Sequence, residues 1–442
     1  MSRWHIRVDT GGTFTDCLAV DPSGDLHRAK VLSSSALRGR VLRRSDDSTL
    51  VIEAPWTAPS GFLAGYNLRI LGVEEPLAGL SITDSVAAQQ LTIQSNLPPE
   101  AVPGAVFEVS AGEEAPVLAA RLITGTALHD ALPEMELRLA TTRGTNALLE
   151  RKGVPTALFV TRGFGDLLRI GDQRRPDLFA LQVRKTLPLT QDLVEVEERL
   201  DADGRVVRPL SLEGLEDVAR DLLTRGVRAA AVALMHSYRN AEHEERVAAF
   251  LRDMGFETVA ASASLAPLIK ILPRAQTAVV EACLGPIIDG YLTRVGACVT
   301  GSVHAMTSAG GLVEATRYHA KDSLLSGPAA GVAGAAVSGG RSGEGRIISF
   351  DMGGTSTDVA RWDGDFEYQF EHTVGDARLV APAMAIETVA AGGGSICRFT
   401  EGRLTVGPES AGADPGPACY GAGGPLTVTD VNLLLGRLDP DR

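Results

Sequence analysis

Two eight-residue segments that repeat one another constrain the fold of this chain more than any other feature. Residues 9–16 read DTGGTFTD and residues 351–358 read DMGGTSTD, so both follow the pattern D-x-G-G-T-x-T-D. Each segment follows an apolar run, at residues 6–8 and 347–350, that predicts a β-strand. A Gly-Gly pair between two strands predicts a tight hairpin turn. The repeat therefore predicts two matched hairpins far apart in the chain.

The residue types in this repeat indicate phosphate binding. Glycines let backbone N–H groups approach a phosphate with no Cβ in the way, and the hydroxyls add further donors. Asp9 and Asp351 stand where carboxylates would bind a hydrated Mg²⁺, so they are the predicted metal ligands. Two such hairpins facing each other would hold the phosphates of a nucleotide from both sides. The predicted phosphate-binding residues are Thr10, Gly11, Gly12, Thr13, Thr15, Gly353, Gly354, Thr355, Ser356 and Thr357.

The glycines of the repeat have one alternative interpretation, and two other types of nucleotide site are excluded. A pair of purely structural turns is the alternative to phosphate binding. A Rossmann or P-loop site is excluded, because no G-x-G-x-x-G opens a helix after the first strand and no G-x-x-x-x-G-K-[ST] occurs.

Composition limits the class of protein and its partners. The 442 residues suffice for two or three domains, and 44% hydrophobic with 22% charged residues is an ordinary globular composition. A net charge of −13 argues against binding to nucleic acid or to an anionic membrane. No secretory signal and no apolar run of about 18 residues is recognised. The five scattered cysteines form no metal pattern and predict reduced thiols in a cytoplasmic protein.

The hydrophobic periodicity predicts an α/β architecture with a β-rich insertion. Short strands separated by turn residues over 36–112 predict a small all-β module, and strands alternate with helices from residue 115 onward. Residues 161–210 are expected to be a long loop, and the chain is expected to be rich in turns after about residue 360. The predicted helices are 115–123, 145–151, 211–224 with Ser211 as its cap, 242–254, 277–295, 331–337 and 429–435.

Several further residues are candidates for a site. Gly392, Gly393, Gly394 and Ser395 suggest backbone contact with a nucleotide, with a tight turn as the alternative. Gly310 and Gly311 follow a predicted strand and either line the cleft or form a simple turn. Arg174, Arg175 and Asp177 suggest a loop that binds a substrate carboxylate, with a solvated loop as the alternative. His243, Glu244 and Glu245 are expected on a solvated helix face.

Together these blocks resemble a known family. The paired hairpins are similar to the two phosphate segments of the actin/hexokinase/Hsp70-type ATPases, and the whole set resembles the hydantoinase A/5-oxoprolinase family. The other segments that carry this resemblance are 145–153, 173–178, 236–240, 326–331, 391–395 and 407–421. The resemblance implies an actin-like (ribonuclease H-like) α/β ATPase fold with an inserted all-β module and an incomplete second lobe. The expected parts are 1–35 and 113–340 (first lobe), 36–112 (β module) and 341–442 (second lobe).

The resemblance also implies an activity. We expect ATP-dependent hydrolysis of a cyclic amide, 5-oxoproline or a hydantoin, with ATP and Mg²⁺ as cofactors and K⁺ as a further candidate ion. The implied catalytic residues are Asp9 and Asp351, with Asp16 and Asp358 as their partners or as hairpin stabilisers. A hydantoinase B-type subunit or domain and an oligomeric assembly are the expected partners. An acetone/acetophenone-type carboxylase subunit and a nucleotide-binding fragment without turnover are the alternatives.

Overall fold

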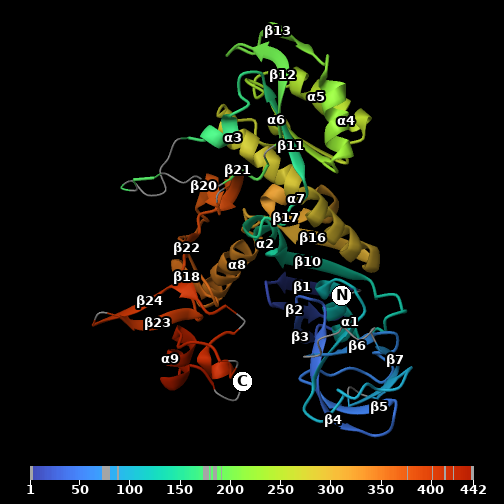
Figure 1. Ribbon diagram of the computed structural model, residues 1–442. Coiled ribbons are helices and arrows are strands. Elements are labelled where there is room, and N and C mark those ends of the chain that lie inside the picture. Colours follow the sequence, from blue (N-terminus) through green and yellow to red (C-terminus); the bar gives the residue numbers. More distant parts are fainter. Residues whose placement is uncertain are drawn as a thin grey trace. The chain divides into compact units, whose positions relative to one another are not determined.

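The protein forms two compact units, seen in the computed structural model in Figure 1. The structure describes residues 3–71, 80–86, 89–172, 179, 181–182, 187–190, 192–375, 377–400, 402–412, 415–421 and 423–439. The first unit comprises Met1–Gly327 and Phe370–Pro382, and the second comprises Pro328–Gln369 and Ala383–Arg442. The division thus falls at residue 327, whereas the sequence suggested a boundary at 340. Segment 370–382 returns to the first unit, where the Val380 N–H donates to Oγ1 of Thr277 (2.8 Å).

The first unit is built around a six-stranded sheet. Its strand order is β17 (Leu312–Glu314), β16 (Gly301–Met306), β10 (Met135–Thr141), β1 (Trp4–Thr10), β2 (Phe14–Val20) and β3 (Leu26–Leu32). Strand β1 pairs with β2 antiparallel and with β10 parallel over its full length. Its side chains alternate, so Ile6 and Val8 are buried while Asp9 is exposed. Burying such apolar side chains stabilises a fold by about 1.5–3 kcal/mol each.

Six strands form a closed barrel within the first unit. Its strands are β4 (Leu37–Arg44), β5 (Thr49–Glu53), β8 (Gln90–Ile93), β7 (Leu80–Val86), β6 (Asn67–Ile70) and β9 (Val106–Ser110), in that order around the barrel. The interior is filled by apolar side chains, among them Phe62, Leu68 and Phe107. Closure leaves no free edge, which suits short strands of this kind. The barrel occupies the lower part of Figure 1, in blue.

A five-stranded sheet forms a second core in the same unit. Its order is β13 (Val206–Ser211), β12 (Asp192–Leu200), β11 (Thr156–Thr161), β14 (Ala229–Ala233) and β15 (Thr258–Ala261). Strands β12 and β13 lie where the sequence suggested a loop, although apolar and charged residues alternate along β12, a pattern that is typical of a half-buried strand. Helix α4 (Leu215–Thr224) begins after Gly214, which lies in the left-handed region, so Ser211 ends a strand and is not the helix cap.

One long helix connects the two cores of the first unit. Helix α7 (Ile271–Cys298) contributes Ala278 and Ala282 to the core of the five-stranded sheet, and Ile288 and Tyr291 to that of the six-stranded sheet. It is long and apolar enough to cross a membrane by length and composition alone, but 67% of its most apolar window is buried. The other helices of this unit are α1 (Ala115–Thr124), α2 (Arg143–Leu149), α3 (Leu167–Ile170), α4 (Leu215–Thr224), α5 (Glu242–Met254) and α6 (Ser262–Leu265), with short 3₁₀ turns η1 (Ala315–Arg317) and η2 (Ala320–Asp322).

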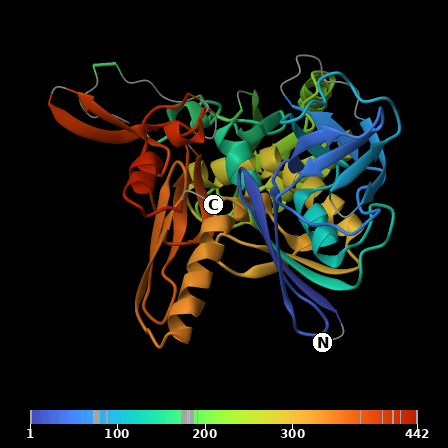
Figure 2. The same cartoon turned by 90° about the horizontal axis from the view of Figure 1, so that it is seen from below.

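The second unit contains the second hairpin and several short strands. Strands β18 (Ile347–Met352), β19 (Thr357–Trp362) and β22 (Glu387–Val389) form a three-stranded sheet. Helix α8 (Ser326–Arg341) packs on it through Ala329 and Val332, and Figure 2 shows α8 in orange beside the strands of this unit. The remaining elements of this unit are the pair β23 (Ser395–Thr400) and β24 (Arg403–Ser410), η3 (Ala418–Tyr420) and α9 (Val428–Leu434). The pair β20 (Tyr368–Val374) and β21 (Ala377–Met384) lies almost wholly within segment 370–382 and so belongs mainly to the first unit. The region after 360 is therefore richer in strands than the sequence suggested.

The alternation of strands and helices predicted a mixed α/β fold, which is confirmed. All five cysteines are free, with Cys17 and Cys283 buried and Cys419 exposed.

Candidate functional site

The first hairpin is closed by one backbone hydrogen bond. The Gly11 N–H donates to the Phe14 carbonyl (3.0 Å), and Asp9 lies directly opposite Asp16 across the strand pair. Asp9 and Asp16 are both exposed, and Asp16 forms an ion pair with Lys30 (3.1 Å). Within the described part of the chain, the N–H groups of Gly12 and Thr13 donate no hydrogen bond. The turn therefore carries two uncommitted backbone donors at its tip.

Residues after β3 support this turn from behind. Ser33 donates its N–H to the Thr13 carbonyl (2.9 Å) and its hydroxyl to the Gly11 carbonyl (2.8 Å). Its hydroxyl also lies 3.0 Å from Oγ1 of Thr15, which is fully buried. The carbonyls of Gly11 and Thr13 thus each accept a hydrogen bond from Ser33, a role that no sequence feature indicated.

A cavity of about 510 Å³ adjoins the turn. This volume lies in the range typical of small-molecule sites. Residues of the hairpin, of the β3–β4 connection and of α1, α2 and α7 form its walls. They include Thr10, Gly11, Gly12, Ser33, Ser34, Glu114, Thr142, Arg143, Asn146, Glu150, Lys152 and Tyr291.

The charged groups of this cavity are already paired with one another. Arg143 donates to both carboxylate oxygens of Glu114 (3.0 Å each), and Arg294 contacts the same carboxylate (2.6 Å). Lys152 pairs with Glu150 at 2.6 Å. Anion binding here would therefore depend on neutral donors more than on free cations.

A buried tyrosine joins this ion pair to the hairpin. The guanidinium of Arg143 lies 4.5 Å from the ring centroid of Tyr291, a cation–π distance. The hydroxyl of Tyr291 lies 3.5 Å from Oγ1 of Thr10. Burial raises the pKa of Tyr291 to about 12, so the ring stays neutral at physiological pH.

The second hairpin has the same turn in the second unit. The Gly353 N–H donates to the Ser356 carbonyl (2.9 Å), and Asp351 lies opposite Asp358. Asp358 accepts a hydrogen bond from Oγ1 of Thr388 (2.6 Å). As in the first turn, the N–H groups of the next two residues, Gly354 and Thr355, donate to no described residue.

The glycine loop at 392–394 supports this second turn. Gly393 and Gly394 donate their N–H groups to the carbonyls of Gly353 (2.9 Å) and Gly354 (2.7 Å). A Cβ on Gly392 would lie 2.6 Å from the Gly354 carbonyl group, so only glycine fits there. The Gly392 N–H donates to Oγ of Ser395, which is buried. All three N–H groups are therefore committed inside the protein, and the glycines serve close backbone packing.

The remaining sequence candidates fall elsewhere. Gly310 and Gly311 form the β16–β17 turn, where Gly310 has φ +77° and donates to the Thr307 carbonyl (2.8 Å), and neither lines the cavity beside the first hairpin. Arg174, Arg175 and Asp177 lie outside the described residues. Among the residues that the structure describes, no group of three or more His, Cys, Asp or Glu side chains could hold a metal ion. Asp9 and Asp351 remain predicted ligands of a Mg²⁺ that would keep most of its ligands from water and phosphate.

One expectation about α5 was wrong. Glu245 is exposed, but His243 and Glu244 are buried. Glu244 accepts from the Leu234 N–H (2.9 Å) and lies 4.0 Å from the buried Arg274, although burial is strong enough to raise the pKa of its carboxyl. His243 pairs with the buried Glu198 (2.9 Å). These polar contacts join the strands to the helices. The charged character of His243 and Glu244 did not indicate in the sequence that they are buried.

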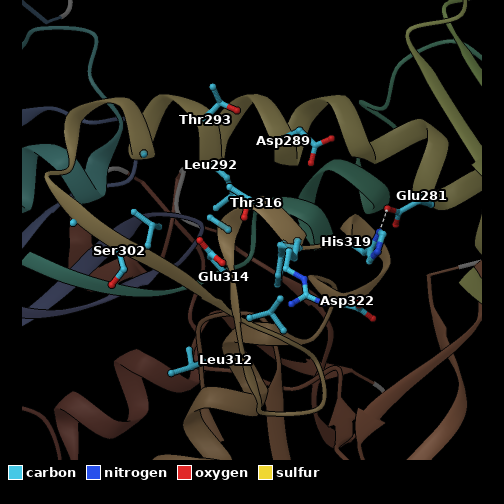
Figure 3. Close-up of a pocket in the computed structure, with 17 residues that line it drawn as sticks. Glu281, Asp289, Leu292, Thr293, Ser302, Leu312, Glu314, Thr316, His319 and Asp322 are labelled. Atoms are coloured by element: carbon cyan, nitrogen blue, oxygen red, sulfur yellow. Dashed lines mark hydrogen bonds and ion pairs between the residues drawn. The ribbon is translucent and has the colours of Figure 1, made fainter. Parts of the chain in front are cut away.

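A second cavity of about 1,440 Å³ lies between α7 and the β16–β17 edge of the first unit. Figure 3 shows Asp289 and Thr293 on α7, and Glu281 joined to His319 by a dashed line. The His319–Glu281 distance is 2.9 Å, and this hydrogen bond raises the pKa of His319. Four carboxylates line the cavity, from Glu281, Asp289, Glu314 and Asp322.

Known structures show the class of protein to which this fold belongs. The nucleotide-free structure of an acetone carboxylase covers 99% of this chain and 55% of its own chain, with a TM-score of 0.67 and 24% identity. An ATP-dependent caprolactamase from Pseudomonas jessenii covers 69% of this chain and 46% of its own, with a TM-score of 0.58 and 32% identity. The protein thus has the mixed α/β fold of these enzymes.

Sequence comparison identifies the family. Residues 83–255 match the hydantoinase/oxoprolinase N-terminal region, and residues 274–442 match the hydantoinase/oxoprolinase family itself. The chain belongs to the hydantoinase/oxoprolinase family.

Individual relatives agree with this assignment. 5-Oxoprolinase 1 of Arabidopsis thaliana is 44% identical over 330 residues, which is 69% of this chain and 26% of the relative. The acetophenone carboxylase gamma subunit of Aromatoleum aromaticum is 34% identical over 72% of this chain and 47% of the relative. The chain therefore spans about a quarter of the length of the plant 5-oxoprolinase that it matches.

Proposed function

We propose that this chain is the nucleotide-binding part of an ATP-dependent enzyme that opens a cyclic amide, such as 5-oxoproline or a hydantoin. The observation that carries the proposal is the pair of D-x-G-G-T-x-T-D turns, each closed by the same hydrogen bond and each with two uncommitted N–H groups at its tip. Membership of the hydantoinase/oxoprolinase family, with 5-oxoprolinases among the relatives, supports the choice of substrate class. An actin-like ATPase fold for the two units is part of the proposal.

The chemistry explains why such a reaction needs ATP. A lactam is stabilised by amide resonance, and its carbonyl carbon is a poor electrophile. Bound Mg·ATP would supply a phosphoryl group to the amide oxygen, which makes the ring carbon open to attack by water. The turn N–H groups of Gly12, Thr13, Gly354 and Thr355 would bind phosphate oxygens in this proposal. Asp9 and Asp351 would hold Mg²⁺ through its water ligands.

A carboxylase function is the second candidate. The 34% identity to an acetophenone carboxylase gamma subunit favours it specifically. In such a reaction the phosphoryl group would go to an enol or to bicarbonate, while the turns would keep the same task. The two candidates therefore differ in substrate and share the nucleotide site.

The test measures ADP production by the purified chain, alone and with a hydantoinase B-type partner protein. Each assay contains Mg·ATP and one of 5-oxoproline, hydantoin, caprolactam, or acetophenone with bicarbonate. ADP release stimulated by a lactam is the expected result. Stimulation only by acetophenone with bicarbonate would favour the carboxylase instead. Mg·ATP binding without ADP release in any assay, partner included, would show a nucleotide-binding part without turnover and overturn the proposal.

A further inference from the structure

Helix α2 places an amide side chain in the cavity beside the first hairpin. A Cβ built on Gly12 would lie 3.6 Å from Nδ2 of Asn146, so this amide nitrogen adjoins the tip of the turn. Gly12 and Asn146 line the same cavity of about 510 Å³. Asn146 is half-buried, and its side chain makes one long hydrogen bond, from Nδ2 to Oγ1 of Thr142 (3.4 Å).

The side-chain amide of Asn146 has hydrogen-bonding groups that no described residue uses. Within the described part of the chain, Oδ1 of Asn146 and the second hydrogen on Nδ2 have no partner. The N–H groups of Gly12 and Thr13 are uncommitted as well. The cations of the same cavity, in contrast, are paired with Glu114 and Glu150. The neutral donors are thus the groups left to receive an anionic oxygen.

The position of α2 relative to the turn is held by several contacts. Thr142 donates its N–H (3.0 Å) and its hydroxyl (3.3 Å) to the Thr10 carbonyl, next to the glycines of the turn. Thr145 donates its hydroxyl to the Leu324 carbonyl (2.5 Å). A Cβ on Gly144 would lie 2.1 Å from Oγ of Ser323, so α2 approaches its neighbours as closely as glycine allows. Donors fixed in this way lose little entropy when they bind a ligand.

We propose that Asn146 is a nucleotide-binding residue, whose amide donates to the same phosphate oxygens as the N–H groups of Gly12 and Thr13. The proposal rests on the function proposed above, because it assigns one more ligand-binding group to that site. Neutral donors of this kind suit Mg·ATP, since the metal ion already neutralises part of the phosphate charge. Asn146 acts by direct contact, and Thr142 and Gly144 position it.

The test is a titration of the purified chain with Mg·ATP by isothermal calorimetry, for the parent and for Asn146→Ala and Asn146→Asp. We expect Asn146→Ala to weaken binding about tenfold, the usual effect of losing one hydrogen bond to a charged group. Asn146→Asp keeps the size of the side chain but brings a carboxylate to the phosphates, so it should weaken binding further. Asn67→Ala, exposed on the outside of the barrel, is the matched control and should bind as the parent does.

The outcomes separate this inference from the proposed function. Parent-like affinity in both Asn146 variants, when the parent binds Mg·ATP, would overturn the role of Asn146 and leave the proposed function standing. A parent that binds no Mg·ATP would overturn both. Unchanged nucleotide affinity with a raised KM for the lactam would overturn the phosphate contact and assign Asn146 to the substrate. Thermal unfolding of each variant confirms that the titrated protein is folded.

Discussion

The turn at Gly11 in the first unit and the turn at Gly353 in the second use the same hydrogen bond to close, at 3.0 and 2.9 Å. Their supports differ. In the first turn, the hydroxyl and the N–H of Ser33 donate hydrogen bonds to the carbonyls. In the second turn, the N–H groups of Gly393 and Gly394 donate to the carbonyls instead. One local sequence thus forms one local structure, while unrelated segments supply the supports.

The strands that carry the two turns differ more. Ile6 and Val8 of β1 are 0% and 4% exposed, whereas the equivalent Ile348 and Phe350 of β18 are 74% and 69% exposed. Strand β1 lies between β2 and β10, while β18 pairs with β19 alone among the described strands. Burial is therefore set by the neighbours of the motif and not by its pattern.

The largest expected effect is a loss of ATP turnover, and it tests whether the two turns contribute equally to that activity. Asp9→Asn and Asp351→Asn should each lower ATP turnover by about a hundredfold or more, because an amide binds Mg²⁺ and its waters far less well than a carboxylate. Both side chains are exposed, so the unfolding temperature should stay within a degree or two of the parent. ADP release and differential scanning calorimetry measure the two quantities. A loss in one variant only would break the equivalence of the turns.

Gly392→Ala should affect the second turn alone. The added Cβ meets the Gly354 carbonyl group at 2.6 Å, so the backbone must move at a cost of about 3 kcal/mol. Hydrogen exchange should show lost protection in β18 and β19, with β1 and β2 unchanged. Gly354→Ala is the control for stability, since its Cβ would meet nothing within 4 Å. Equal protection in both variants would show that the loop does not support the turn.

Acid should loosen the support of the second turn. Burial opposes ionisation of Asp430, but hydrogen bonds from Cys419 and Thr427 outweigh it and hold the pKa of that carboxyl well below its usual range. A lowered folded-state pKa stabilises the protein above the unfolded pKa of about 3.9, and this contribution is lost as the pH falls through the folded value. Since the Thr429 N–H donates to the Gly393 carbonyl (2.8 Å), α9 is linked to the loop.

Asp430→Asn should therefore lower the free energy of unfolding of the second unit near neutral pH. Below pH 4 the free energy of unfolding of this variant should depend less on pH than that of the parent. Urea unfolding followed by hydrogen exchange, at pH 7 and at pH 3, measures this difference. A variant as stable as the parent at pH 7 would contradict the assigned role of the carboxylate.

The smallest expected effect is on stability, when one threonine hydroxyl is removed from each turn. Thr357 donates to the Ala391 carbonyl, which has no other hydrogen-bond donor among the described residues, so Thr357→Val should cost about 1.5 kcal/mol. Thr15→Val should cost about 0.5 kcal/mol, because Ser33 keeps its bond to the Gly11 carbonyl. Urea unfolding of the two variants gives both values, and the reverse order would contradict this account of the supports.

Sequence reasoning succeeded where structure is local. The hairpins, the helix at Glu242–Met254 and the strand at Leu26–Leu32 follow from periodicity and turn residues within a few positions of each other. It failed for β12, although apolar and charged residues alternate along that strand, and for Glu244, whose partner Arg274 lies on another helix. Charge alone carries no information about burial when the compensating groups come from distant segments.

By itself the sequence determined the two matched turns, the α/β class and the family, because each is recognised from short segments whose residues are neighbours in the chain. Only the tertiary structure decided what surrounds the turns. The parallel pairing of β1 with β10 brings Thr142 to the Thr10 carbonyl and Asn146 to Gly12, across more than a hundred residues of intervening chain. The physical reason is that a turn is closed by a hydrogen bond between near neighbours, whereas a cavity needs walls from distant segments that only sheet pairing brings together.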